Sequence, residues 1–516
     1  MDEVYSKAEE VIVDLGDSDE DTEELLLELN RYQLIPESVW FQIDIKASQS
    51  SIARSIELCT TMKLPGPTSK FWHTFRRFMG RPWFIRVWIV QEFALSQRAR
   101  FMIGPHFRDK KFLRNAISRA AKHLEILYLQ DRFYNAPVEP NKTLGDAIWD
   151  VLPKYHAVHR ISLTAEQAGT SRSLCELLDA TTTYFKATKD CDKVYALLGM
   201  VTDATIKSDI VVDYNESLAN LMLRTSQYLI QRQARNYVLY HSVGDRPGYS
   251  SWTINLQGPP DGLPHLINPD GALKYGDFTA GGLSSYECQP SQSRAGGIVV
   301  RACVVDAIHM AMARGIPSNS ELSTQEDLAS HAKWKLHAVK WMLDVVPTQS
   351  LPLHEFTKLC WRVIVADLIM PSEGEGRGYC RMRDWPGSAR CLDTVNTIFR
   401  AVYQKWTGEL PASYTMDLTS TQLNDIRIYG DSMSHTTGRK LAMSHKLNGA
   451  CLVPSDSRIG DHIVVVQGCQ MPFIMRLDCD EKGDYYRLVG CAYVHGVMDG
   501  EIMQGQDWNF KDLEIC

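Results

Sequence analysis

The segment at residues 82–94 is apolar on almost every side, and this restricts where it can lie in a fold. Its first residue is a proline, which suits the first turn of a helix because its missing N–H has no helical partner there. We therefore expect one helix, buried because it is apolar all round. Glu92 lies on this helix, one turn beyond Trp88. A buried carboxylate needs a partner, and Arg81 and Arg86 are the nearest cations in sequence.

Composition and charge exclude several classes of protein. The chain has 516 residues, of which 44% are apolar and 23% charged, as in globular proteins of several domains. With 55 basic and 62 acidic residues the net charge is −7, which gives no overall attraction to nucleic acid. The sequence contains no run of 18 apolar residues, so no membrane span is predicted. The 13 cysteines include no Cys-x-x-Cys pair, so reduced thiols and a cytoplasmic location are expected.

The residue pattern changes along the chain and predicts four regions. Residues 1–105 combine helices with two short strands, which indicates an α/β arrangement. Residues 106–240 have mainly helical periodicity, and residues 241–430 mix loops with helices. Residues 431–516 contain short segments rich in β-branched and aromatic residues, separated by glycine turns. This last pattern predicts a small antiparallel barrel or meander.

Three blocks of the chain carry a recognisable set of residues. The first has Arg-Pro-Trp-Phe, Arg-x-Trp and Gln-Glu elements in order over residues 81–92. The second is the Asp-Lys-Val-Tyr-Ala-Leu-Leu-Gly run at residues 192–199, and the third holds Gly-Asp, Pro-Phe and Tyr-Val-His-Gly elements over residues 460–501. In combination they resemble the fungal heterokaryon incompatibility (HET) domain family. The residues that match the family in the first two blocks are Arg81, Pro82, Trp83, Phe84, Arg86, Trp88, Gln91, Glu92, Asp192 and Lys193.

The resemblance implies both a biological role and a fold. HET proteins act in nonself recognition between fungal individuals, and their activation triggers cell death. The HET domain is similar to TIR domains, some of which cleave NAD, which implies a doubly wound α/β core with a ligand site at the carboxyl ends of its strands. The family's opening strand and first motifs have no counterpart here, so residues 1–105 are expected to be the C-terminal part of a truncated HET-like domain.

Glu92 is the candidate for chemistry. A desolvated glutamate has a raised pKa and can act as a general acid or base. The alternative is a structural ion pair with an arginine that fixes the helix. Arg81 and Arg86 suit a phosphate-bearing ligand, or else they satisfy Glu92 or helix-end carbonyls. Trp83 and Trp88 are expected in the core rather than as a platform for base stacking.

Other polar pairs indicate structure rather than chemistry. His156 and His159 have the spacing of two metal ligands, but no third ligand completes the pattern, so no metal site is predicted. Asp192 beside Lys193 is typical of a hydrogen-bonded helix start. The nucleophile elbow Gly-x-Ser-x-Gly and the zinc motif His-Glu-x-x-His do not occur.

Together these features predict a HET-domain-like protein of nonself recognition and cell-death signalling, acting as a non-enzymatic interaction or signalling module. The alternatives are a TIR-like enzyme that cleaves NAD with Glu92 in its site, and an inactive remnant. No cofactor is expected, and NAD enters only as the substrate of the enzymatic alternative. Protein partners are expected, self-association is left open, and neither nucleic acid nor a membrane span is predicted.

Overall fold

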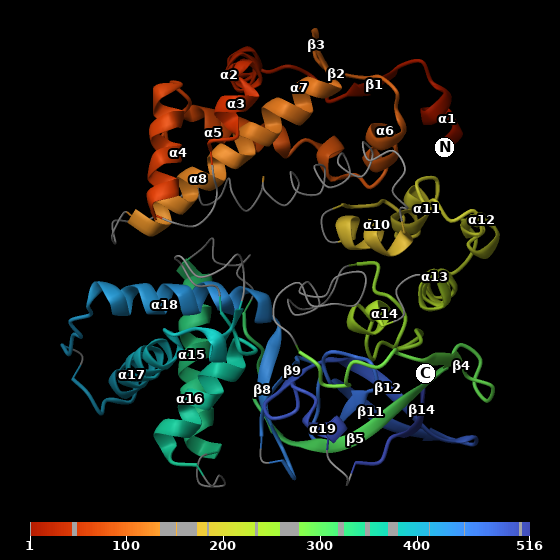
Figure 1. The fold of residues 1–516 in the computed structure, drawn as a ribbon, viewed down its shortest axis with the longest axis vertical. Helices are drawn as coiled ribbons and strands as arrows, with labels where there is room; N and C mark the ends of the chain where they lie inside the picture. The colour runs from red at the N-terminus through yellow and green to blue at the C-terminus, as the bar shows by residue number, and fades with distance from the viewer. Residues whose placement is uncertain are drawn as a thin grey trace. The chain divides into compact units, whose positions relative to one another are not determined.

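The chain forms two compact units, Met1–Leu218 and Ala219–Cys516 (Figure 1). Each unit has its own sheet and its own buried core. The structure is a computed structural model that describes residues 2–43, 49–134, 151, 173–182, 185–232, 236–257, 278–317, 325–345, 351–369, 380–411, 413–447, 449–504 and 508–516.

The first unit contains a small sheet in the strand order β1–β2–β3. Strands β1 (Val11–Asp14) and β2 (Ala99–Ile103) run parallel, and β3 (His106–Asp109) returns antiparallel to β2. Parallel neighbours need a crossover connection, which here is helical. Val13 and Phe101 are register partners and both are buried. This parallel pair agrees with the α/β start predicted for residues 1–105.

Local sequence signals set the ends of several helices in the first unit. Ser69 caps one helix by accepting a hydrogen bond from the Phe71 N–H at 3.2 Å, and Gly80 follows its last turn. Ser173 and Glu176 form a reciprocal capping box. The helical elements are α1 (Asp2–Lys7), α2 (Thr22–Leu34), α3 (Glu37–Trp40), α4 (Gln49–Thr61), α5 (Lys70–Met79), η1 (Pro82–Ile85), α6 (Ile89–Leu95), α7 (Lys110–Phe112), η2 (Leu113–Ile117), α8 (Ser118–Tyr134), α10 (Leu174–Thr181), α11 (Asp192–Leu198) and α12 (Ile206–Asp209).

Aromatic side chains of α2, α5 and α8 form the centre of the first unit. The Tyr32 hydroxyl and His123 Nδ1 are 2.8 Å apart in a hydrogen bond that is fully buried. The Trp72 ring meets the His123 ring edge-on, with centroids 5.5 Å apart. Burial lowers the pKa of His123 to about 3, because the charged imidazolium has no solvent there.

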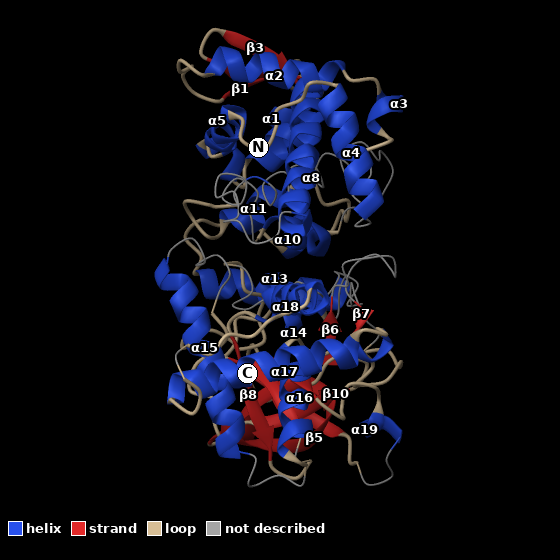
Figure 2. Cartoon of the chain, turned by 90° about the vertical axis from the view of Figure 1, so that its left-hand side faces the viewer, coloured by secondary structure: helices blue, strands red, loops and turns tan. Residues whose placement is uncertain are grey.

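The second unit combines helices with a closed barrel (Figures 1 and 2). Its helical elements are α13 (Leu218–Arg232), α14 (Tyr237–Tyr240), α15 (Gln325–Val345), α16 (Leu353–Ile364), η6 (Met382–Asp384), α17 (Ser388–Thr407), α18 (Ser420–Ser432), η7 (Met433–Thr436) and α19 (Glu501–Gln504). Its strands are β4 (Cys288–Pro290), β5 (Ile298–Ala311), β6 (Leu368–Ile369), β7 (Cys380–Arg381), β8 (Arg439–Ser444), β9 (Ala450–Pro454), β10 (His462–Val466), β11 (Phe473–Asp480), β12 (Gly483–Cys491), β13 (Tyr493–Val494) and β14 (Lys511–Ile515).

The long strand β5 holds the barrel together. It pairs with β4, β8, β10 and β14, and the ring β10–β11–β12–β14–β5 closes because β10 pairs with both β11 and β5. The sequence predicted a small antiparallel module within residues 431–516. The barrel differs in two respects, since β5 enters it from earlier in the chain and β12 runs parallel to β14 at Tyr486 and Ile515. Strand pairing over such a separation leaves no local signal in the sequence.

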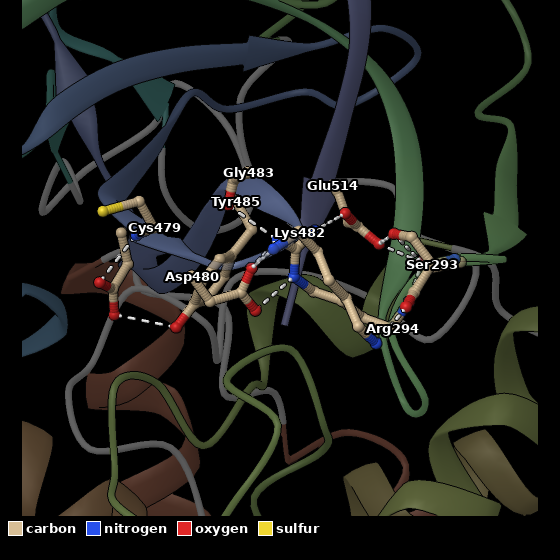
Figure 3. Close-up of polar contacts among 10 residues, drawn as sticks. Ser293, Arg294, Cys479, Asp480, Lys482, Gly483, Tyr485 and Glu514 are labelled. Atoms are coloured by element: carbon tan, nitrogen blue, oxygen red, sulfur yellow. Dashed lines mark hydrogen bonds and ion pairs between the residues drawn. The ribbon is translucent and has the colours of Figure 1, made fainter.

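A buried arginine ties three parts of the barrel together (Figure 3). Arg294, 8% exposed, precedes β5 and donates to the Asp480 carboxylate, through Nε at 3.1 Å among other contacts. It also forms an ion pair with Glu514 of β14 and donates to the Gly483 carbonyl at 2.8 Å. The Tyr485 ring lies 4.7 Å from the guanidinium. These contacts fix the β11–β12 hairpin and the last strand to the start of β5.

Helices α15–α18 pack with one another beside the barrel, and Figure 1 shows them on one side of it. α16 contacts both β8 and β9. This helix ends at Ile364. Ala366 and Asp367 have left-handed backbones, with φ of 51° and 59°, and the short strand β6 follows them.

Candidate functional site around Glu92

The helix expected over residues 82–94 is interrupted in its middle. A 3₁₀ turn, η1, begins at Pro82, and α6 starts only after a break. Within the break Arg86 is extended, with φ −83° and ψ 133°, and the Val87 N–H donates to the Lys186 carbonyl at 2.9 Å. The prediction of one continuous helix is wrong because this distant segment satisfies the backbone in place of a helical partner.

Glu92 lies in the first turn of α6 and is held by two neutral donors. Trp83 Nε1 donates to its Oε2 at 2.9 Å, and the Tyr5 hydroxyl donates to its Oε1 at 3.4 Å. The side chain is partly buried and makes no ion pair with a described residue. An indole and a phenol thus hold the carboxylate, in place of the arginine expected from the sequence.

The electrostatics of Tyr5 maintain this arrangement. Burial raises the pKa of Tyr5, and the charge and hydrogen bond of Glu92 raise it further, against an opposing effect of the Arg86 charge. The phenol therefore stays protonated at neutral pH and remains a donor. Two donors orient the Glu92 carboxylate but leave further lone pairs, so the site has the chemistry of a hydrogen-bond acceptor or a general base.

The two arginines of this block have different contacts. Arg81 donates from Nη1 to the Leu15 carbonyl at 2.6 Å and from Nη2 to the Asp17 carbonyl at 2.9 Å. Its guanidinium therefore secures the loop at the carboxyl end of β1, a role that differs from the Glu92 or helix-end contacts expected from the sequence. Arg86 is exposed, and its charge acts on Tyr5.

The apolar members of the block contribute to the core. Trp83 is 6% exposed, and its ring meets those of Phe84 and Phe101 edge-on at 5.2 Å in each case. Trp88 is partly exposed at the start of α6. Gln91 is 2% exposed, and its Oε1 accepts no hydrogen bond from a described residue. Trp83 thus joins the core and orients Glu92 with the same indole.

Lys193 and Asp192 begin the helix of the second matched block. The Lys193 ammonium, 9% exposed, donates to the Thr182 carbonyl at the end of α10 at 3.2 Å, where the helix dipole favours a cation. Burial lowers the pKa of Lys193, and the charge of Asp190 opposes this. Asp192 accepts a hydrogen bond from the Tyr214 hydroxyl at 2.8 Å. The two side chains therefore bond to other elements, and the N-cap residue Cys191 makes no side-chain capping bond, in contrast to the local helix-start network expected from the sequence.

The first unit brings the two matched blocks together. Arg86 and Lys186 form an isolated parallel β-bridge, and α11 packs against α6. No hydrogen bond or ion pair among the described residues joins Glu92 to Asp192 or to Lys193. The blocks therefore share a packing interface, while their polar side chains serve separate networks.

Tyr5 is the site residue that sequence reasoning missed. It lies 87 positions from Glu92, and nothing in the local sequence around either residue indicates a contact between them. The order of the elements does, however, indicate that the two helices are neighbours. Helix α1 leads into β1 and α6 leads into β2, so parallel pairing of these strands brings the two helices side by side. Pairing the strands before assigning partners would have placed Tyr5 beside Glu92.

Comparison with known proteins identifies two parts of the chain. The family described as heterokaryon incompatibility protein (HET) matches residues 1–92, which contain Tyr5, Trp83 and Glu92. The Het-6 β-barrel domain matches residues 399–510, which contain strands β8 to β13. No curated protein and no solved structure matches the chain.

The chain thus contains one segment that is similar to the heterokaryon incompatibility family and a second that is similar to the Het-6 β-barrel domain. In the part of the chain that the structure describes, no helix is long and apolar enough to cross a membrane. The same described residues include no group of three or more His, Cys, Asp or Glu side chains that could hold a metal ion. His156 and His159 lie outside the described residues.

Proposed function

We propose that this chain is a non-enzymatic interaction and signalling module of fungal nonself recognition, whose engagement leads to cell death. The observation that supports this most directly is the way Glu92 is held. Its carboxylate is bonded to Trp83, a core residue, and to Tyr5 of a second helix, so its contacts join elements of the fold. A signalling module depends on such a stable shape rather than on a reactive group.

A TIR-like enzyme that cleaves NAD is the second candidate, and an inactive remnant is the third. Two observations support the enzyme. Glu92 has no cationic partner among the described residues, so its charge is available to a ligand. Strands β1 and β2 form a parallel pair with a helical crossover, as in a doubly wound core.

Expression of the chain from an inducible promoter in a filamentous fungus separates these candidates. Cell death is followed by dye uptake, and cellular NAD is measured in the same cultures. The Glu92→Gln variant removes the charge and keeps one acceptor oxygen, for either Trp83 or Tyr5, because its other terminal atom is an amide nitrogen. Glu57→Gln, at an exposed position of α4, is the matched control.

The non-enzymatic module predicts cell death without prior loss of NAD, and equal death with Glu92→Gln. Early NAD loss that Glu92→Gln abolishes and Glu57→Gln preserves would assign the enzymatic role instead. Absence of both effects from a protein that is folded and abundant would leave the inactive remnant.

A further inference from the structure

Helix α2 exposes large apolar side chains on the face opposite its core contacts. Leu25, Leu26 and Leu29 are buried against the first unit. Leu27 and Leu34 are 68% and 73% exposed. Because seven residues make two helical turns, these two leucines lie on the same face of α2.

The segment after α2 continues this apolar exposure. Phe41 follows α3 and is 80% exposed. Isolated exposed leucines are ordinary, but several exposed large apolar side chains within one short segment, residues 27–41, are typical of an interaction site. We call this group the α2 surface. It comprises the three apolar side chains Leu27, Leu34 and Phe41 and the carboxylates Glu20, Glu23, Glu24 and Glu37.

The α2 surface is strongly acidic. Residues 20–41 contain six acidic residues and one basic residue, so their net charge is 1 − 6 = −5. The one cation, Arg31, is engaged by Glu28 at 2.9 Å. The four carboxylates of the surface make no ion pair with a described residue. Glu23 and Glu24 are one helical turn from Leu27, so charge and apolar area adjoin.

A cleft of about 100 Å³ lies beside this surface, between α2 and α5. Its lining includes the apolar side chains of Leu25 and Phe71 and the carboxylates of Glu24 and Glu28. Asp21, which also lines it, is neutralised by Lys70 at 2.6 Å. The lining also contains the cations Arg31, Lys63 and Lys70, so the charges of the cleft are balanced, and the case for a basic partner rests on the exposed carboxylates of α2.

We propose that the α2 surface binds a basic amphipathic helix of a partner protein. The apolar stripe of that helix packs on Leu27, Leu34 and Phe41, and its lysines and arginines face Glu23 and Glu24. The apolar contacts would supply the affinity for the helix, and the carboxylates would select a partner of positive charge.

The negative charge of the α2 surface favours a basic helix over a second copy of the chain or an anionic membrane. A second copy in a two-fold dimer would place the same surface on both partners, so the four carboxylates of the surface would face four more. An anionic membrane would be repelled for the same reason. A basic partner removes the repulsion, and so it fits where the others do not. The inference rests on this surface alone and does not depend on the role proposed above.

The test uses the full chain and a fluorescein-labelled synthetic peptide of about 18 residues, five helical turns, with leucines at helical spacing and lysines elsewhere. Binding is followed by fluorescence anisotropy at low and at physiological salt. The variants are the double substitution Leu27→Ser with Leu34→Ser, and the double substitution Glu23→Gln with Glu24→Gln. The control Leu423→Ser removes a half-exposed leucine of α18, and a peptide with glutamates in place of lysines controls for charge.

The proposal predicts saturable binding of the basic peptide that the leucine variant weakens about tenfold or more. The glutamine variant should weaken binding at low salt and flatten its salt dependence, because fewer charges are screened. Leu423→Ser should bind as the unchanged chain does. All variants alter exposed side chains, so circular dichroism should show an unchanged fold.

Three results would overturn the proposal. They are no binding of the basic peptide, equal binding of the acidic peptide, and equal binding by the leucine variant and the unchanged chain. A dimer in light scattering that the leucine variant abolishes would assign the α2 surface to a second copy and would equally reject a basic partner.

Discussion

Asp367 illustrates at the residue scale how this fold accommodates charge in its interior. Its carboxylate is fully buried and accepts hydrogen bonds from Arg362 Nε and Arg381 Nε, each at 2.6 Å. Arg381 is itself 4% exposed and also pairs with Asp499 at 2.8 Å. Asp367 and its neighbour Ala366 have left-handed backbones, which residues with a Cβ rarely adopt. The ion pairs therefore hold a strained turn between α16 and β6.

The substitution Asp367→Asn keeps the size of the side chain and removes the negative charge that pairs with Arg362 and Arg381. We expect the free energy of unfolding to fall by about 3 kcal/mol, because Arg381 remains buried with a weaker counter-charge. Urea denaturation measures the change. The control is Asp480→Asn beside Arg294, where the carboxylate is 42% exposed and water screens the charge, so the expected loss is smaller. Equal losses at the two positions would show that burial does not set the energy of these pairs.

At the element scale, the sequence predicted what local signals encode. The apolar run at residues 11–13 predicts a strand, and phenylalanines at helical spacing before Gly80 predict a helix; the structure has β1 and α5 at these positions. The break at Arg86 was not predicted, because its cause is the distant Lys186. Strand β5 was not predicted either, although Ile298 begins a β-branched run, since the loops before it masked the pattern.

The candidate site divides in the same way. Glu92 was chosen from its place on an apolar helix, and its role stays a prediction. Trp83 was predicted as a core residue, which the structure confirms, whereas Trp88, also expected in the core, is partly exposed. The partners of Glu92 were not predicted. An indole nine positions away and a phenol on another helix come together only through the break at Arg86 and the parallel pairing of β1 with β2.

The contact between the β10–β11 turn and the segment before β4 depends on a glycine. A Cβ at Gly281 would overlap the Val466 carbonyl oxygen and lie 2.7 Å from that of Cys469. We expect Gly281→Ala to lower the free energy of unfolding by about 3 kcal/mol, because backbone atoms must move. Gly408→Ala is the matched control, since Gly408 ends α17 with φ 81° and open space around it. At Gly408 the free energy of unfolding should fall by about 1 kcal/mol, because alanine is strained in the left-handed backbone conformation but meets no neighbouring atom. A similar loss at both positions in urea denaturation would contradict the close approach.

At the scale of the whole molecule, buried histidines make the chain sensitive to acid. Burial lowers the pKa of His123 to about 3 in the first unit and that of His435 to about 4 in the second. In the unfolded chain a histidine has a pKa of about 6.5. Between pH 6.5 and these lower values the unfolded chain therefore binds protons that the folded chain does not, and stability falls as pH falls.

A carboxylate extends the effect to lower pH. Burial alone would raise the pKa of Asp499, but the hydrogen bond and charge of Arg381 and the charge of Arg383 bring it below its usual range. The stability that this pair contributes is present above the carboxyl's unfolded pKa and is lost as pH falls through the folded value. Histidines and carboxylate thus destabilise the fold in the same direction, over successive ranges of pH.

Replacing the two histidines with glutamine should flatten this dependence. Glutamine does not titrate and keeps a polar group for the Tyr32 hydroxyl and the Val365 carbonyl. Each histidine should contribute a slope of about 1.4 kcal/mol per pH unit between pH 6.5 and about 4.5. We therefore expect His123→Gln and His435→Gln each to reduce the fall in the free energy of unfolding over that range. The measurement is urea denaturation followed by tryptophan fluorescence at several pH values. The exposed His73→Gln of α5 should follow the unchanged chain, and if it alone flattened the curve, burial would not be the cause.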